Sequence, residues 1–281
     1  MNDLANLYDF RGDYEKAEAL HRETLEIATR MLGPEHPWTV SAMFNLAVVY
    51  HDRGKYAEAE VLHKKTVEIA SHVLGTENGD TLQFMTGLAN TYRDEYRFVQ
   101  AEALYISTLA VQRRVFGPQY PDTLLTRSNL ASMYQRQGKY ALAEANAAEV
   151  LAAQRSRNSN SGDGDTMDAA ADLALACEAQ GKFSKSLSLA QEALAFDRDQ
   201  RPDDWQRFRA ETIAGASLAG LKKFAEAEPM LLEGYRGMFA RKEQIAIPDR
   251  YHLDLARQWI VQLYHAWEKP EQAETWEKKQ N

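Results

Sequence analysis

Apolar and small residues recur along the chain with the spacing of one face of a helix. A first run ends shortly before Gly54, and a second begins near Tyr56. A glycine between such runs supplies the left-handed residue that commonly follows the end of a helix. The pattern therefore predicts two helices joined by a tight turn. The first run consists of Met43, Leu46, Ala47 and Tyr50, at i, i+3, i+4 and i+7.

This helix pair recurs at a step of 42 residues. Four separate residue series share the step, which indicates tandem repeats rather than chance. A single hairpin cannot bury both of its faces, so neighbouring hairpins are expected to stack. In the second helix, Ala59 is expected to face Ala47 and let the two helices approach closely. The four series are Ala17, Ala59, Ala101 and Ala143; Gly33, Gly75 and Gly117; Thr39, Thr81 and Thr123; and Tyr8, Tyr50, Tyr92 and Tyr134.

The chain has a regular N-terminal part and a divergent C-terminal part, which differ in how strictly they keep the 42-residue step. Residues 1–154 keep the 42-residue step, and counting back from Thr39 predicts a shortened first helix, as in a fragment of a longer chain. Residues 155–165 are rich in Ser, Asn, Gly and Asp and predict a flexible loop. Residues 166–281 are expected to hold three divergent repeats, with steps of 43, 41 and 46, and a C-terminal cap over about 270–279. The whole is predicted to be a single all-α solenoid.

Helix boundaries follow from capping residues. The pairs Asp80-Thr81 and Asp122-Thr123 offer side-chain oxygens that are expected to cap the next first helix. In the sixth repeat, Lys222 stands where glycine is expected. Trp259, Trp267 and Trp276 are expected to close the last hydrophobic face, and Trp38 to pack on the neighbouring turn.

Composition narrows the classes of function. The 281 residues carry a formal net charge of −8, which disfavours nucleic acid and anionic membranes as partners. The N-terminus lacks a signal peptide pattern, and no apolar run is long enough to span a bilayer. The single cysteine, Cys177, excludes an intramolecular disulfide and stands at a core position. We therefore expect a cytoplasmic protein.

The motif pattern resembles tetratricopeptide repeats of the 42-residue kinesin light chain-like subtype. The residues that carry the resemblance are Leu32-Gly33-Pro34-Glu35-His36-Pro37 between repeats and Asn45-Leu46-Ala47 or Asn129-Leu130-Ala131 in the first helix. The resemblance implies a right-handed superhelical solenoid of about seven helix-turn-helix repeats, with about fourteen helices. It also implies that first helices line a concave groove that binds protein or peptide.

The C-terminal stretch resembles the repeat tails of bacterial serine/threonine kinases. The resemblance lies in Leu231–Tyr235, Pro248-Asp249-Arg250 and Ile260–Trp267. The chain has no His-Arg-Asp motif, no Asp-Phe-Gly motif and no glycine-rich phosphate loop. The resemblance thus implies a non-catalytic, regulatory part of a signalling protein.

Few residues suggest chemistry. His21 and His63 share a repeat position, but without further ligands they are expected to be surface or groove residues rather than a metal pair. The run from Gly162 to Asp165 lacks the spacing and the closing glutamate of a calcium loop. No set of nucleophile, base and acid stands out. We therefore expect no enzyme activity, cofactor or metal.

Polar residues opposite the core stripe of the first helices are the candidate binding residues. The resemblance implies that Asn45 and Asn129, two repeats apart, hold the backbone of an extended peptide. Arg93, Arg136 and Arg97 would add a preference for acidic side chains. The alternative is a self-assembly module; the chain would then form a homo-oligomer instead of a monomer. The predicted peptide-binding residues are Asn45, Asn90, Arg93, Asn129, Ser132, Gln135 and Arg136.

Overall fold

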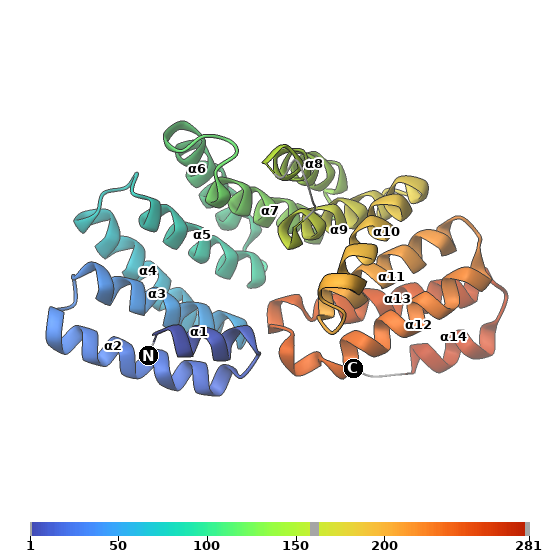
Figure 1. Cartoon of the computed structure of the whole chain (residues 1–281), viewed down its shortest axis with the longest axis horizontal. Coiled ribbons are helices and arrows are strands. Elements are labelled where there is room, and N and C mark those ends of the chain that lie inside the picture. The colour runs from blue at the N-terminus through green and yellow to red at the C-terminus, as the bar shows by residue number, and fades with distance from the viewer. Residues whose placement is uncertain (1, 158–162, 279–281) are drawn as a thin grey trace. The chain divides into compact units, whose positions relative to one another are not determined.

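The chain forms a succession of helix-turn-helix repeats (Figure 1). The computed structural model describes residues 2–157 and 163–278. Those residues contain fourteen α-helices, two short 3-10 helices and no strand, which confirms the predicted all-α repeat fold. None of these helices is both long and apolar enough to cross a membrane. The α-helices are α1 (Asn2–Phe10), α2 (Tyr14–Leu32), α3 (Pro37–Asp52), α4 (Tyr56–Val73), α5 (Gly79–Asp94), α6 (Phe98–Val115), α7 (Pro121–Arg136), α8 (Tyr140–Arg157), α9 (Gly164–Glu178), α10 (Phe183–Gln200), α11 (Trp205–Gly220), α12 (Phe224–Ala240), α13 (Tyr251–Ala266) and α14 (Pro270–Glu277).

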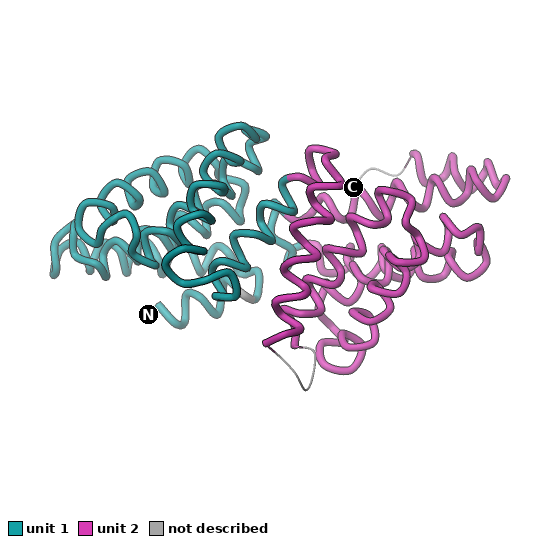
Figure 2. The backbone as a smooth tube through the Cα atoms, turned by 90° about the horizontal axis from the view of Figure 1, so that it is seen from above, with its two compact units in different colours: residues 1–133, 243–248 teal, residues 134–242, 249–281 magenta. Residues whose placement is uncertain are grey.

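Two compact units make up the chain (Figure 2). The first comprises residues 1–133 and 243–248, and the second comprises residues 134–242 and 249–281. Odd-numbered helices are the first helices of the hairpins, and even-numbered helices are the second. Besides packing on its partner, a first helix also contacts the first helix of the next repeat, as α3 contacts α5 in the first unit and α9 contacts α11 in the second.

Alanine sets the distance between the two helices of a hairpin. Ala47 on α3 and Ala59 on α4 are fully buried, as the 42-residue series predicts. The equivalent Ala101 is also fully buried, and Ser186 takes this place in the fifth repeat with its hydroxyl bonded to the carbonyl oxygen of Ala174. Small side chains at this position allow close packing, so larger substitutions are expected to force the helices apart.

A left-handed residue follows the first helix in all seven hairpins, even where it is not glycine. Gly54 has φ of 69°, and Lys222, which replaces glycine in the sixth repeat, has φ of 61°. Tyr96 and Glu268 adopt the same conformation with φ of 61° and 57°. The turn around Lys222 keeps its two closing hydrogen bonds, with the amide of Lys222 bonded to the carbonyl of Ala219 and that of the next residue bonded to Leu218. The turn geometry thus persists where its preferred residue has been lost.

The predicted caps of the first helices are wrong. Helix α5 begins at Gly79, and its cap is Asn78, whose side-chain oxygen accepts from the amide of Asp80 at 2.9 Å. His36 caps α3 in a similar way through Nδ1. Thr81 lies inside α5 and is fully buried, and Thr123 is equally buried in α7. The helices begin earlier than expected because the residue after the inter-repeat turn already offers a capping side chain.

The predicted loop at 155–165 is shorter at both ends. Helix α8 continues to Arg157, and α9 begins at Gly164 with Asp163 as its cap. The middle of the predicted loop, residues 158–162, lies outside the described residues.

The C-terminal cap ends at Glu277, and the predicted end at Lys279 lies outside the described residues. Helix α14 buries Ala273 and Trp276, and the Trp276 ring meets Tyr235 edge-on. Trp259 is buried and Trp267 stacks on Phe224. Trp276 thus packs against α12 as expected of a residue that closes the last hairpin, whereas Trp259 faces residues of α9 and α11 instead.

Candidate functional site

A stripe of half-buried side chains runs along the first helices of the first unit. On α3 it holds Asn45 and Val48, and the equivalent positions on α7 hold Asn129 and Ser132. On α5 the stripe is more buried, because Gly87 lies at the place of Asn45 and contacts the preceding repeat. A Cβ at Gly87 would stand 2.6 Å from the Phe44 ring and 2.9 Å from His63 Cε1. An asparagine could not occupy that position without displacing both rings.

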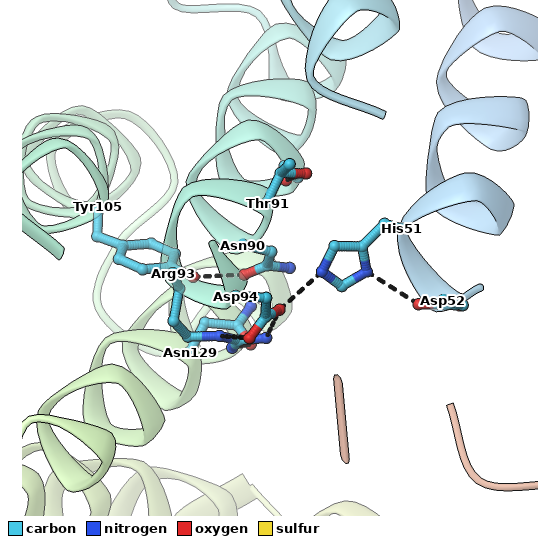
Figure 3. A network of polar contacts seen from close by, with 9 residues as sticks. His51, Asp52, Asn90, Thr91, Arg93, Asp94, Tyr105 and Asn129 are labelled. Carbon is cyan, nitrogen blue, oxygen red and sulfur yellow. Dashed lines mark hydrogen bonds and ion pairs between the residues drawn. The ribbon is translucent and has the colours of Figure 1, made fainter. Parts of the chain in front are cut away.

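A polar network joins α3, α5 and α7 at one end of this stripe (Figure 3). His51 Nε2 lies 2.7 Å from Asp94 Oδ2, and His51 Nδ1 lies 3.0 Å from Asp52 Oδ1. Arg93 donates to both oxygens of Asp94, from Nη2 at 2.7 Å and from Nε at 3.0 Å. A longer contact of 3.5 Å runs from Arg93 Nη1 to Asn129 Oδ1 on α7. Two cations and two carboxylates thus alternate within one chain of contacts.

Burial and the neighbouring carboxylates shift the pKa of His51 in opposite directions. Burial lowers the pKa of the imidazole, but hydrogen bonds to Asp52 and Asp94 and the charges of both carboxylates outweigh it and raise the pKa to about 9. The ring is therefore an imidazolium at neutral pH and donates from both nitrogens. Asp94 and Arg93 are also almost fully buried. Charges removed from water to this degree are stable only when paired.

A neighbouring carboxyl, Asp9 on α1, has no such partner in the described part of the chain. Its Oδ1 is buried, and among the described residues none bonds to that atom. Burial and the charge of Asp52 raise the pKa of Asp9 to about 7. Asp9 is therefore an acid near the network that is partly protonated at neutral pH.

The three predicted asparagines have different environments. Asn45 Nδ2 donates to Asn2 Oδ1 at 3.0 Å, close to solvent. Asn90 accepts a hydrogen bond of 2.5 Å from the hydroxyl of the buried Tyr105, which fixes its amide oxygen and leaves its Nδ2 to point elsewhere (Figure 3). Within residues 2–157 and 163–278, Asn129 receives the long contact from Arg93 and no other side-chain hydrogen bond.

The remaining predicted residues lie along α7. Ser132 is half-buried and belongs to the first unit, whereas Gln135 and Arg136 belong to the second. In the second unit the Arg136 guanidinium lies over the Tyr251 ring, 4.4 Å from its centroid. Gln135 Oε1 is buried and has no bonding partner among the described residues.

Arg93 and Arg97 are engaged within the chain. Arg93 is bound to Asp94 as described, and Arg97 pairs with Glu60 and Glu95, both at 2.8 Å. These internal pairs remove the free charge on which the expected preference for acidic peptides depends.

Three other expectations concern single residues. His21 and His63 are not surface residues: each is 1% exposed, and burial lowers the pKa of both. Trp38 does not pack on the neighbouring turn, since 76% of it is exposed. Cys177 is fully buried, as expected for its core position. The prediction of surface positions for the two histidines is wrong, because the sequence shows that they share a repeat position but not that this side of α2 and α4 packs against neighbouring helices.

Sequence reasoning missed His51 and Asp9 as site residues, and also Glu178 on α9, whose carboxyl has its pKa raised to about 7 by burial. Each stands three residues before the left-handed turn residue of its repeat, as does Arg93. This register, counted back from the turn, was the signal that could have grouped them. It places an ionisable side chain at the same point of the first helix in five of the seven repeats, the fifth being His265.

Comparison with known proteins agrees with the repeat architecture. A comparison with curated proteins returns no match. Among solved structures, a kinesin light chain-type protein of Podosopora anserina with nearly identical TPR-like repeats is 25% identical, with 71% of this chain and 95% of that chain covered and a TM-score of 0.56. BtubC (BKLC) from P. vanneervenii is 22% identical over 69% of this chain and 77% of that chain, with a TM-score of 0.58.

The widest coverage among these structures is that of a Rap protein complexed with competence and sporulation factor. It covers 98% of this chain and 94% of its own at 10% identity, with a TM-score of 0.62, which shows a shared fold only. The family model for the tetratricopeptide repeat matches residues 1–72 and 80–156, more than half of the chain. The chain belongs to the tetratricopeptide repeat family.

Proposed function

We propose that the chain binds an extended segment of a partner protein along the first helices of its first unit. One observation carries the proposal: half-buried asparagines, Asn45 and Asn129, recur at the same repeat position of α3 and α7. Partly exposed amide groups at one repeat position offer hydrogen bonds that suit a peptide backbone.

Asparagine is suited to this role because its side chain offers both a donor and an acceptor. An extended peptide exposes unpaired amide and carbonyl groups along both edges, so Asn45 and Asn129 could bind it with little regard to its sequence. Asn90, one turn from the matching position on α5, has its oxygen held by Tyr105 and would act through its amide nitrogen. Gly87 interrupts the row for the steric reason given above.

The family supports binding rather than catalysis as the role of this chain. One protein of similar fold is a Rap protein in complex with competence and sporulation factor. The resemblance of the C-terminal stretch to kinase repeat tails extends the proposal: the binding face would then belong to the regulatory part of a signalling protein. A cytoplasmic location is part of the same proposal.

A double substitution tests the proposal. Peptides selected from a displayed random library against the whole chain would be measured by calorimetry against Asn45→Ala/Asn129→Ala. We expect the double variant to lose roughly 1 to 3 kcal/mol of binding free energy, or about 5- to 150-fold in affinity, because two desolvated hydrogen-bond sites are removed. Its circular dichroism should be unchanged, since neither side chain belongs to the core.

Asn146→Ala is the matched control. Asn146 lies on α8, a second helix, and its side-chain amide donates to the carbonyl of Leu142 in the same helix. Selected peptides should bind this control as they bind the parent. Equal binding to the parent and the double variant would rule out the proposed face.

Self-assembly is a second candidate, favoured by one observation. Met31 and Trp38 flank the turn between the first two repeats and are 70% and 76% exposed. Large apolar side chains exposed this fully often mark a contact surface. Light scattering after size exclusion would show a dimer that Trp38→Ser abolishes; a monomer at high concentration would exclude this candidate.

A further inference from the structure

A cavity of about 160 Å³ lies in the second unit, on the side of the first helices. Helices α9, α11 and α13 supply nearly all of its lining, and Phe183 at the start of α10 completes it. Its volume admits several water molecules or the end of one side chain. The lining residues are Glu178, Phe183, Ala216, Ala219, Gly220, Trp259, Gln262, Leu263 and Ala266.

Glu178 is the one ionisable group in this lining. Burial raises the pKa of its carboxyl to about 7, and a hydrogen bond from Trp259 acts in the opposite direction without overcoming it. Among the described residues no cation forms an ion pair with Glu178, whereas the buried carboxylates Glu18, Asp94, Asp197 and Glu211 each have one. A half-buried carboxylate without a countercharge is costly, and a ligand that brought a positive charge would remove that cost.

The cavity is narrow, and most of its lining is apolar. Helix α11 contributes only Ala216, Ala219 and Gly220, and a Cβ at Gly220 would lie 2.4 Å from the Phe183 ring. Leu263 and the aromatic rings close the other sides. Gln262 adds a second polar group whose amide oxygen can accept a hydrogen bond. The lining therefore matches an aliphatic chain that ends in a hydrogen-bond donor of positive charge.

We propose that this cavity binds a lysine side chain of a partner peptide, with the ammonium group hydrogen-bonded to Glu178 and the methylenes against the apolar walls. This inference rests on the proposed function, because it assumes a peptide ligand for the repeats. Lysine fits because its ammonium is a compact charge with three donors on a flexible four-carbon stem, whereas the guanidinium of arginine is broad and planar. The net charge of −8 favours a cationic ligand.

Butylammonium is the probe, since it reproduces the end of a lysine side chain. It would be titrated into the whole chain while NMR follows the Trp259 indole N–H and the Glu178 carboxyl carbon. We expect saturable shifts of both signals and a Glu178 pKa that falls below about 7 as the probe binds. Butanol, of similar shape without the charge, should bind at least tenfold more weakly.

Two variants define the site. Glu178→Gln keeps an acceptor for Trp259 but loses the charge, and should weaken butylammonium at least tenfold. Glu226→Gln, an exposed position on α12, should leave the affinity unchanged. Equal binding of butylammonium and butanol, equal binding to Glu178→Gln, or no shift of Trp259 would each overturn the proposal.

Competition experiments with peptides test whether the cavity binds a lysine of a peptide or only small free amines. A short peptide with one lysine should compete with butylammonium, and the same peptide with norleucine should not; competition by neither peptide would overturn the assignment to a peptide lysine. The Asn45→Ala/Asn129→Ala variant should bind butylammonium as the parent does. A variant that no longer binds peptide along the first unit but still binds butylammonium would show that the two proposals fail or hold independently.

Discussion

Asp94→Asn tests whether the polar network holds the first unit together. Asp94 accepts from His51 and twice from Arg93, so the substitution removes the charge that both cations share. The raised pKa of His51, about 9 against an ordinary 6.5, corresponds to roughly 3 kcal/mol of favourable interaction with its carboxylates. Asp52 would keep part of the interaction with His51, but Arg93 would lose its charged acceptor. We therefore expect Asp94→Asn to lower the free energy of unfolding by about 2 to 4 kcal/mol at pH 7.

The pH dependence gives the sharper readout. A histidine whose folded pKa is raised adds stability that is complete below the unfolded pKa and is lost as the pH rises through the folded pKa. For His51 the window runs from pH 6.5 to about 9. The free energy of opening of α3 and α5 should therefore fall by roughly 2 kcal/mol between pH 6 and pH 8 in the parent. In Asp94→Asn this slope should shrink to less than half.

Hydrogen exchange measured by mass spectrometry reports the opening of these two helices separately from the rest of the chain. Asp80→Asn is the control, because Asp80 is an exposed acid in the first turn of the same helix. It should change stability by less than about 1 kcal/mol and leave the slope intact. A parent protein without the slope, or an Asp94→Asn variant that retains it, would refute the reasoning.

Three further predictions concern other parts of the chain. His63 is buried with its pKa lowered to about 3 by burial and by the charge of His51, so stability should fall as the pH drops below 6.5, by roughly 2 kcal/mol at pH 5. Urea unfolding should show a smaller acid slope in His63→Gln, whereas His72→Gln, exposed on the same helix, should keep the parent slope. Lys222→Gly should raise the free energy of unfolding by about 1 kcal/mol, since a left-handed conformation strains lysine but not glycine, and Lys223→Gly should lower it. Trp276→Ala should cost about 3 to 5 kcal/mol in calorimetric unfolding, and a loss below about 1 kcal/mol would contradict the capping role of α14.

The sequence was sufficient for the architecture because the repeat step records which residues face the core. The alanines at 47 and 59, the turn glycines and the number of helices all followed from that step. Even Lys222 could be placed at a turn, because the surrounding repeat fixed its register.

The site was harder to predict because its chemistry depends on contacts between repeats. Arg93 looked like a free cation when α5 was viewed alone; only the position of Asp94 beside His51 of the preceding repeat shows why it is bound internally. The burial of Gly87 likewise depends on Phe44, 43 residues earlier. Periodicity within one helix cannot reveal such partners.

The pairing between His51 and Asp94 also bears on how such arrays grow. The second and third repeats each present a base followed by an acid, His51-Asp52 and Arg93-Asp94, and the base of one repeat meets the acid of the next. This rule is directional, so a duplicated copy of either repeat would bring its own half of each new contact. A tandem copy of the second repeat would therefore place His51 of one copy beside the Asp52 equivalent of the next. Arg136, which stands at the acid position of the fourth repeat, ends the series, because Arg93 meets no acid there.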